Sequence, residues 1–529
     1  MIIVGHELST DLTTLVRSGY TLPDCEYFCT STAAQWLEPG TDHSLEHLVL
    51  QETSMGMWRS TLGKVKPAEF DEMSDDELGR RCGGDAEGAL RLYPIYKARI
   101  EQAGFQKVWA LAMDVLPILA EIGGVGMRVD TRALTERATT TDRWLKKEKA
   151  ALEQQLGIIN LNSHIQIAEA LFGRHGATPL HRTTQGYSTD RTALLWARYQ
   201  AQQAGSSRLA TLLSRVLDYG AQSKLASTYY QGWLDAIGTG QRVHSFYSLG
   251  RTATGRLASF GVNLQNVPEK ARELIVPSDG FDYIVQADAS QIEWRVTAHL
   301  SGDRLMRQWI IDGRDAHSIV AARVMGLPEP QTKKEFERFK IEHKLERDTG
   351  KMSNFATIFL VSADSLVRQI AKMTEGTVWL PEETTQQYIN TFFKTFTGYQ
   401  DYISNIWYAL HRKERIRSPF GRSWQLPPTP AGWRRGVNYP TQSTASDIIL
   451  LILRAVVREL RRRQMKSRVI GEVHDSVILE VTKRELSDIV QIVRYAFTHP
   501  DTSQFGFTLS VPLAVECSYG LNLAQLEVI

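Results

Sequence analysis

Cysteine is scarce in this sequence: only four occur among 529 residues, and their spacing fits no zinc or redox motif (Cys25, Cys29, Cys82 and Cys517). A zinc centre and a disulfide-built scaffold are therefore excluded. Long apolar runs are missing too, since no stretch of 18 uncharged apolar residues occurs. The first residues lack the basic region and apolar core of a signal peptide. We expect a cytoplasmic protein without a membrane span.

Neither positive nor negative charge is in large excess, since the net charge is only +2. Basic residues nevertheless gather in the last quarter of the chain. Such runs fit either solvated helix faces or a surface that binds a polyanion, and the composition leaves both interpretations open. The basic residues are Arg412, Lys413, Arg415, Arg417, Arg434, Arg435, Arg461, Arg462, Arg463, Lys466 and Arg468.

The chain has no internal repeat or low-complexity segment, and its length predicts two or more domains. Residues 1–112 show a mixed α/β pattern, and helical periodicity dominates from 113 to 240. Residues 131–156 carry charges on most faces, which predicts a long exposed helix. Ser163 is placed to cap an amphipathic helix. From 281 onward strand-like runs alternate with long helices, as in an α+β domain.

Two carboxylates stand at strand ends far apart in the sequence. Asp288 follows an apolar strand-like run, and Asp475 lies between the strand-like runs 469–473 and 477–481, at the tip of a predicted hairpin. Either residue alone could simply form a turn. Together on adjacent strands they would provide hard oxygen ligands for Mg²⁺. Two such ions held about 4 Å apart serve in-line attack at phosphorus.

A third stretch has side chains spaced by four, which places them on one helix face. Arg347 and Lys351 come first, and Phe355 and Phe359 follow. The cations can grip a polyphosphate and the rings can cover a base. The alternative is a half-buried helix with a charged end.

These stretches, taken in order, resemble the family A DNA polymerases. "DASQIEWR" and "VHDS" are similar to the two palm motifs, "RDTGKMSNFATIF" to the fingers motif, and "TATGRLASFGVNLQNVP", "DAHSIVA" and "RRGVNYPTQSTASDII" to segments between them. The likeness covers about residues 113–520. It implies a right-hand fold with the thumb at about 113–245, the palm at about 246–302 and 425–529, and the fingers at about 303–424.

The resemblance implies a template-directed DNA polymerase that uses two Mg²⁺ ions, for which Mn²⁺ can substitute. Asp288 and Asp475, with the Ala289 carbonyl, would hold the metals, and Lys351 would also protonate the leaving pyrophosphate. Glu293 would leave no room for a ribose 2′-hydroxyl. The implied nucleotide-binding residues are Arg347, Lys351, Phe355, Phe359, His317, Glu293 and Gln291.

Other matched positions imply contact with primer-template DNA. Polar groups in the minor groove can test base-pair shape, because its acceptors are nearly the same for every correct pair. For Asn438 and Gln442 the alternative is helix capping or surface polarity. The implied DNA-binding residues are Arg256, Asn438, Gln442, His474, Arg434 and Lys224.

Two other functions compete with this interpretation. One is a single-subunit RNA polymerase, against which Glu293 argues. The other is a primer-template-binding protein without catalysis, against which the intact Asp288 and Asp475 argue. We expect a monomer that acts on primer-template DNA with deoxynucleotides, away from membranes. A helicase, a primase or a separate exonuclease is a candidate partner, and the compact form suits a phage replicase or a repair enzyme.

The first 112 residues resemble part of the family's RNase H-like 3′→5′ exonuclease domain. Asp11 and Asp85 match two of its acidic positions, but Glu7 and Arg81 depart from the pattern, and the first acidic motif should precede this start. Because proofreading needs those carboxylates to hold metals, we expect an exonuclease remnant without activity, with a truncated gene product or one half of a split enzyme as the alternatives.

The polymerase motifs also contain departures. Ser476 stands where the family usually has Glu, Phe359 where it has Tyr, and Ala356 and Leu360 where it has Gly. Without a phenol at 359, Glu293 loses a hydrogen-bond partner. We therefore predict that Phe359→Tyr changes fidelity or sugar selectivity without abolishing synthesis. Misincorporation assays test this, and no change in either property would refute it.

Overall fold

The computed structural model describes residues 1–58, 72–238 and 240–529. The chain divides into two compact units. Unit 1 comprises Met1–Val129, Ala236–Leu300 and Ile403–Ile529, and unit 2 comprises Asp130–Asp235 and Ser301–Tyr402. Unit 1 thus holds the predicted palm with the N-terminal region, and unit 2 holds most of the predicted thumb and fingers. The predicted boundary after residue 112 lies inside helix α6 (Gln106–Val125).

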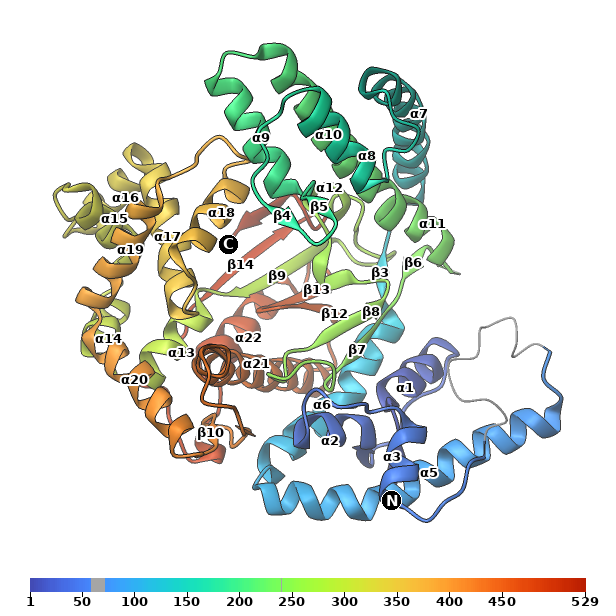
Figure 1. Ribbon diagram of the computed structural model, residues 1–529. Coiled ribbons are helices and arrows are strands. Elements are labelled where there is room, and N and C mark those ends of the chain that lie inside the picture. The colour runs from blue at the N-terminus through green and yellow to red at the C-terminus, as the bar shows by residue number, and fades with distance from the viewer. Residues whose placement is uncertain (59–71, 239) are drawn as a thin grey trace. The chain divides into compact units, whose positions relative to one another are not determined.

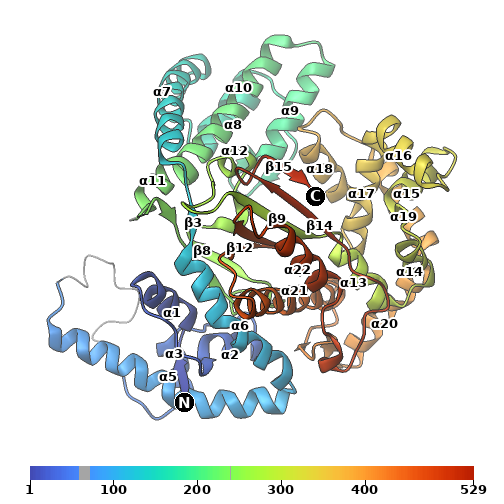
Figure 2. The same ribbon diagram turned by 180° about the vertical axis from the view of Figure 1, so that it is seen from behind.

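A five-stranded sheet forms the centre of unit 1, with strand order β12-β13-β9-β14-β15. Every neighbouring pair is antiparallel. Helices α21 and α22 lie over one face of the sheet, as the view from behind shows (Figures 1 and 2). The bounds are β9 (Tyr283–Ala289), β12 (Arg468–Val473), β13 (Ser476–Val481), β14 (Val515–Gly520), β15 (Leu526–Val528), α21 (Pro430–Arg462) and α22 (Leu486–Thr498).

The two faces of strand β9 differ in burial. Val285, Ala287 and Ala289 are buried, whereas Gln286 and Asp288 between them are not. Side chains alternate across a strand, so the apolar set packs toward the covering helices and the polar set lies on the other face. This alternation places Asp288 on the face that the helices leave open.

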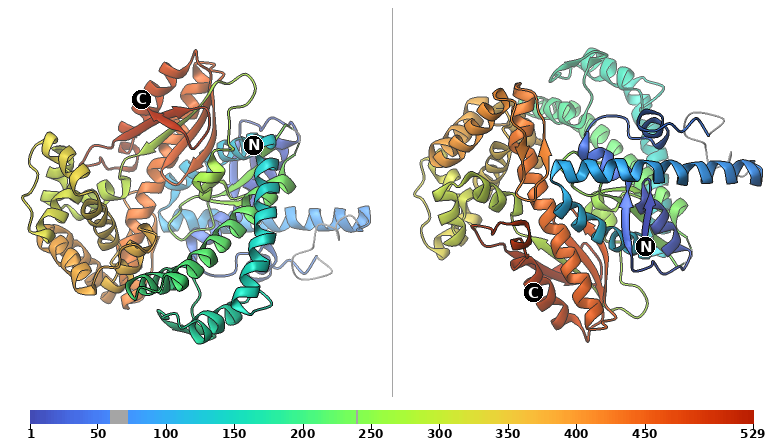
Figure 3. Two further views of the ribbon diagram at one scale, coloured as in Figure 1. Left: turned by 90° about the horizontal axis from the view of Figure 1, so that it is seen from above. Right: turned by 90° about the horizontal axis from the view of Figure 1, so that it is seen from below.

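The N-terminal region contains a two-stranded parallel sheet of β1 (Ile2–Gly5) and β2 (Glu26–Cys29). Its apolar side chains join one continuous core with those of α6, α21 and the central sheet. Helix α5 begins at a capping box of Ser74 and Glu77 and extends as the long blue helix in Figure 3. The helices are α1 (Leu8–Arg17), α2 (Thr30–Leu37), α3 (Leu45–Glu52) and α5 (Asp75–Ala103).

Among the described residues, one helix, α6, is long and apolar enough by composition to cross a membrane, and 67% of its apolar window is buried inside the fold. That burial is typical of a core helix. The remaining elements of unit 1 are short: β3 (Met127–Arg128), β6 (Arg242–Val243), β7 (Ser245–Ser248), β8 (Ala258–Gly261), η3 (Leu264–Asn266), α12 (Glu269–Arg272), α13 (Ile292–Ser301), β10 (Ile416–Arg417), β11 (Ser423–Trp424) and η4 (Ser503–Phe505).

In the predicted thumb, α7 spans Thr131–Leu156, as the charge pattern predicts, and Ser163 caps α8 through its side chain. Helix α7 (teal) and α10 (green) lie alongside each other in Figure 3. The other elements are α8 (His164–Ala168), η1 (Glu169–Arg174), β4 (Arg182–Thr183), β5 (Gly186–Tyr187), α9 (Arg191–Gln203), α10 (Ser207–Lys224), η2 (Leu225–Gln231) and α11 (Gly232–Ala236).

The predicted fingers are helical up to His411, and the short strands β10 and β11 follow in unit 1. Helix α17 packs against α15 and α19. The elements are α14 (Arg304–Ile311), α15 (Ala316–Met325), α16 (Lys333–Glu342), α17 (Lys344–Ile358), α18 (Ala363–Met373), α19 (Glu382–Thr395) and α20 (Thr397–His411), the last of which ends in unit 1.

Helix α17 ends one residue before Phe359, and Leu360 then adopts a left-handed backbone with φ +54°. Leucine pays a steric penalty in this conformation, and glycine does not. We therefore predict that Leu360→Gly is more stable than Leu360→Ala by about 1 kcal/mol. Urea unfolding of the two variants measures the difference, and both lack the leucine side chain. A more stable alanine variant would contradict the prediction.

Candidate active site

The two aspartates meet at one end of the central sheet. Strands β12 and β13 form a hairpin whose turn contains His474 and Asp475, as predicted. Ser476, the next residue, pairs in register with Asp288 on β9. The Ala289 amide donates to the Asp475 carbonyl at 3.0 Å. Since neighbouring strands lie about 4.8 Å apart, Asp288 and Asp475 are on adjacent strand ends.

At this strand end, burial disfavours the ionised form of Asp475. Burial raises the pKa of Asp475, and nearby Arg256 and His474 lower it in part. Two carboxylates on adjacent strands and a backbone carbonyl are the oxygen donors that Mg²⁺ prefers. The residues present therefore fit a divalent metal. No group of three or more His, Cys, Asp or Glu side chains suited to a metal occurs in the described ranges.

Glu293 lies close to this pair, in the first turn of α13. Its side chain is mostly buried, and burial raises the pKa of its carboxyl, while the Arg256 guanidinium lowers it and Asp475 raises it. Arg256 donates directly to Glu293. The departure at Phe359 therefore does not leave Glu293 without a partner, because Arg256 supplies one within the same unit. Gln291, just before α13, has a left-handed backbone with φ +55°.

The sheet also brings a third carboxylate beside Asp288. Glu516 on β14 pairs in register with Asp288, so the two side chains point to the same face. Ser476 occupies the equivalent place on the other side. The acidic group that is missing at Ser476 thus has a counterpart on β14. No sequence pattern indicates this, because Glu516 becomes a neighbour only through the strand order.

Glu472 is another residue that the sequence analysis missed. It lies on β12, fully buried, and its carboxylate accepts from the Gln265 amide at 2.7 Å. Burial raises the pKa of Glu472 to about 8, with the charge of Asp475 adding to the rise. Gln265 also accepts from the Ser259 backbone amide at 2.8 Å. A protonated Glu472 therefore ties the β12–β13 hairpin to β8 and the segment that follows it.

Three of the predicted DNA contacts in unit 1 form one row on α21. Arg434, Asn438 and Gln442 are spaced by four inside this helix, so helix capping is excluded for them. Arg434 is exposed, and the other two are half-buried. The buried Asn438 Oδ1 has no hydrogen-bond partner within the described part of the chain. His474 is exposed in the hairpin turn with φ +59°.

In unit 2, α17 presents the predicted nucleotide-binding residues. The Arg347 Nε donates to Asp315 Oδ2 at 2.9 Å, which fixes the guanidinium at the start of α15. Lys351, one turn further, is exposed. Phe355 is half-buried, and its ring centroid lies 5.5 Å from that of His317. Asp315 is a positioning residue that the sequence analysis left without a role.

His317 lies inside the packed helices rather than on the surface. It is fully buried, and the Asn354 amide lies 3.0 Å from its Nδ1. Burial lowers the pKa of His317 to about 4, so it is neutral near pH 7 and offers no positive charge. Its contact with a triphosphate stays a prediction. Lys224 is exposed at the end of α10, where the helix passes into η2.

The basic run near the end of α21 is largely neutralised by carboxylates. Arg461 pairs with Glu121 on α6, and Arg462 and Arg463 pair with Glu459. Arg468 pairs with the buried Glu480. This part of the run therefore has a structural role, and the structure favours it over a polyanion-binding surface.

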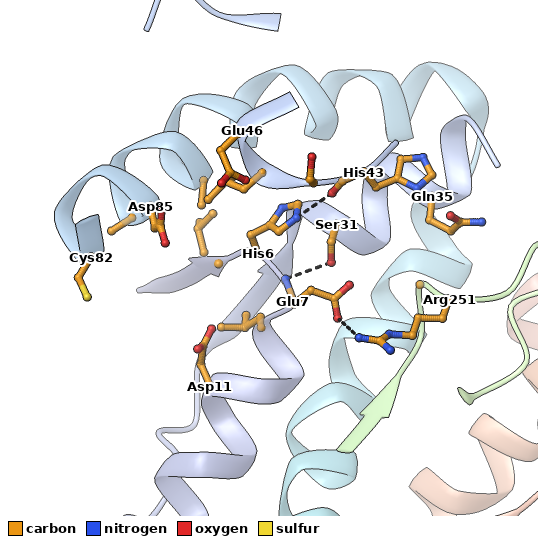
Figure 4. Close-up of a pocket in the computed structure, with 18 residues that line it drawn as sticks. His6, Glu7, Asp11, Ser31, Gln35, His43, Glu46, Cys82, Asp85 and Arg251 are labelled. Carbon is orange, nitrogen blue, oxygen red and sulfur yellow. Dashed lines mark hydrogen bonds and ion pairs between the residues drawn. The ribbon is translucent and has the colours of Figure 1, made fainter. Parts of the chain in front are cut away.

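The two predicted exonuclease positions line one cavity of about 950 Å³ in the N-terminal region (Figure 4). Asp11 comes from α1 and Asp85 from α5. Burial, then the charges of Glu7 and Asp85, raise the pKa of Asp11 to about 6. Asp85 accepts from the Trp58 indole at 2.8 Å, and Glu7 pairs with Arg251 at 3.7 Å. Two of these three carboxylates are thus engaged by protein groups.

We predict that Glu472→Gln flattens the dependence of stability on pH. The folded-state pKa of about 8 lies above the unfolded value of 4.5, so Glu472 favours folding below pH 4.5 and this contribution is lost as pH rises to 8. The substituted amide oxygen would accept the same hydrogen bond without ionising. At pH 9 the variant should be more stable by on the order of a few kcal/mol.

Urea unfolding between pH 5 and 9 measures this effect. Glu480→Gln is the matched control, because it removes a second fully buried glutamate of the same sheet that pairs with Arg242 and Arg468. This control should lose stability instead. A Glu472→Gln variant that follows the wild-type pH curve would contradict the prediction.

Comparison with known proteins shows which family this chain resembles. DNA polymerase I of Caldicellulosiruptor bescii is 29% identical over 430 residues, which cover 77% of this chain and 46% of the relative. DNA polymerase I of Pseudomonas aeruginosa is 28% identical over 508 residues, which cover 91% of this chain and 52% of the relative. The chain thus spans about half the length of these curated relatives.

A solved structure is similar over nearly the whole chain. It is described as the POL domain of Pol1 from M. smegmatis in complex with DNA primer-template and dNTP, and it has a TM-score of 0.78, with 24% identity over 98% of this chain and 85% of that chain. This likeness shows the fold. The model of DNA polymerase family A matches residues 131–525. The chain therefore belongs to the family A DNA polymerases.

Proposed function

We propose that this chain is a DNA-directed DNA polymerase that extends a primer 3′-hydroxyl with deoxynucleotides. The placement of Asp288 and Asp475 on adjacent strand ends carries the proposal. Family membership supports it, and so does the complex of the similar M. smegmatis structure with primer-template and dNTP. In the reaction the hydroxyl oxygen bonds to the α-phosphorus, and the bond from that phosphorus to the pyrophosphate oxygen breaks.

Asp288, Asp475 and the Ala289 carbonyl would hold divalent ions, Mg²⁺ by preference, with Mn²⁺ as a substitute. Such ions would promote ionisation of the primer hydroxyl and neutralise charge on the pyrophosphate. Glu516, in register with Asp288, adds negative charge to the same face. Its contribution offsets the loss of acid at Ser476.

The exposed Lys351 and the oriented Arg347 would bind the triphosphate, and Lys351 would give a proton to the departing pyrophosphate. Phe355 would stack against the nucleotide. The mostly buried Glu293, held by Arg256, would exclude a ribose 2′-hydroxyl. The row Arg434, Asn438 and Gln442 would follow the duplex, and the unpartnered Asn438 oxygen is suited to a minor-groove donor.

The cavity in the N-terminal region would not support proofreading under this proposal. Asp85 and Glu7 are engaged by Trp58 and Arg251. Asp11, with a pKa of about 6, is partly protonated near neutral pH. A separate exonuclease would then be needed to remove mismatches.

Primer extension with Mg²⁺ and four deoxynucleotides tests the proposal. The wild type should make template-length product, and Asp475→Ala should lower the rate at least roughly a thousandfold, because one of the two metal-holding carboxylates is lost. A 3′-mismatched primer without nucleotides, on the same gel, should stay intact. No extension by the wild type would leave the primer-template-binding alternative, and shortening of the primer would refute the absence of proofreading.

Glu516→Gln is a milder substitution to compare with Asp475→Ala in the same experiment. It keeps both aspartates and removes one charge beside Asp288. We expect template-length product. The Mg²⁺ concentration that gives half the maximal rate should rise roughly threefold, because one solvent-screened carboxylate near the metal site is lost. An unchanged Mg²⁺ requirement would show that Glu516 does not act on the metal site.

A further inference from the structure

The loop Leu249–Arg256 joins the N-terminal region to the candidate active site. At its start, the Trp36 indole on α2 donates to the Leu249 carbonyl at 3.0 Å. Gly250 lies so close to α2 that a Cβ there would be 2.9 Å from Thr32 Cα. Arg251 pairs with Glu7 and stacks on the Phe260 ring at 3.5 Å. The N-terminal region therefore holds this end of the loop.

Trp36 also contacts a buried ion pair elsewhere in unit 1. The Arg422 guanidinium carbon lies 3.4 Å from the Trp36 ring centroid. Arg422 donates to both carboxylate oxygens of Asp447 on α21, at 3.0 and 2.8 Å. Asp447 is fully buried and Arg422 nearly so. A buried guanidinium is stabilised by contact with the face of an aromatic ring. Because the group is planar, it can stack on the ring and bind a carboxylate at the same time.

The far end of the loop rests on this same guanidinium. Gly255 has φ +79°, and a Cβ there would lie 2.7 Å from Arg422 Cζ. The Gly255 carbonyl accepts from the Ser446 hydroxyl at 3.0 Å, and the Ala253 carbonyl accepts from the Trp424 indole at 2.8 Å. A displacement of Arg422 would therefore displace Gly255.

Arg256 follows Gly255 directly and donates to Glu293. Thr252 fixes this turn, because its hydroxyl donates to the Arg256 carbonyl at 2.8 Å. A continuous set of contacts thus runs from Trp36 through Arg422 and Gly255 to Arg256 and Glu293. Every member lies in unit 1.

We propose that Trp36 is a positioning residue for nucleotide selection, through which the N-terminal region holds Arg256 and Glu293 in place by way of Arg422. This inference rests on the proposed polymerase function. It assigns the region a role in synthesis that does not depend on nuclease activity. Trp36 itself touches no reacting atom.

Single-nucleotide extension by the full chain tests the proposal, with kcat and KM measured for a deoxynucleotide and for the matching ribonucleotide. Trp36→Leu should raise the deoxynucleotide KM and lower discrimination against the ribonucleotide, each roughly tenfold, as for a lost desolvated cation–π contact. The kcat should fall less, because Asp288 and Asp475 are untouched. Trp36→Phe keeps an aromatic face for Arg422. Its deoxynucleotide KM and its discrimination against the ribonucleotide should therefore lie close to the wild-type values.

Tyr93→Leu is the matched control. Tyr93 packs edge-on against Phe28 at 4.9 Å, and Phe28 is linked to Trp36 through Trp109. It should change thermal stability and leave KM and discrimination as in the wild type. Equal shifts in Tyr93→Leu and Trp36→Leu, or wild-type values in Trp36→Leu, would overturn the inference.

Arg422→Lys keeps the experiment decisive if Trp36→Leu does not fold. Lysine retains the charge opposite Asp447 but loses the planar stack, so the same shifts in KM and discrimination are expected. Wild-type values in a folded Arg422→Lys would overturn the inference. The wild-type lane separates the two proposals, because a chain that does not extend the primer at all refutes the polymerase function itself.

Discussion

Several carboxylates are held close together at the end of β9. The rest of unit 1 depends on this constraint. Asp288 stands in register between Ser476 and Glu516, with Asp475 in the adjoining turn. These carboxylates repel one another. Helices α21 and α22 are packed on the other face of the sheet, so the carboxylates cannot be moved to that face. Positive charge has to be supplied beside them. Arg256 supplies part of it from within the fold, which makes the fixed position of its loop a requirement.

The pair of Arg256 and Glu293 links this charge balance to the residue proposed to select the sugar. Burial alone would favour protonation of Glu293, and Arg256 opposes that effect. A charged, anchored glutamate keeps a fixed shape, whereas a neutral one would lose its strongest partner. Phe359, directly after α17, carries no phenol, and the pairing within unit 1 gives Glu293 a partner that does not depend on one. Synthesis and sugar selection can therefore depend on separate contacts.

Local patterns were predictable from the sequence, and contacts set by strand order were not. The charge distribution gave the bounds of α7, and the two apolar runs gave the hairpin around Asp475. Helix spacing anticipated the face of α17 but not its end before Phe359, because the left-handed Leu360 carries no glycine signal. Glu516 and the pair Arg422–Asp447 were missed. Their partners lie far away in the chain, and only the folded register brings them together.

The shared core gives the N-terminal region a structural role in the proposed polymerase, whatever its own chemistry. Leu8, Leu12 and Tyr27 belong to the same buried cluster as the apolar residues of β9 and α21, so removing the region would expose apolar surface of the palm. A substitution at Asp11 or Asp85 would leave that core intact. A substitution at Trp36 would reach both the core and the loop that carries Arg256. Substitution of the exonuclease-like carboxylates and loss of the domain therefore have unequal consequences, and only the second disturbs the charge balance at β9.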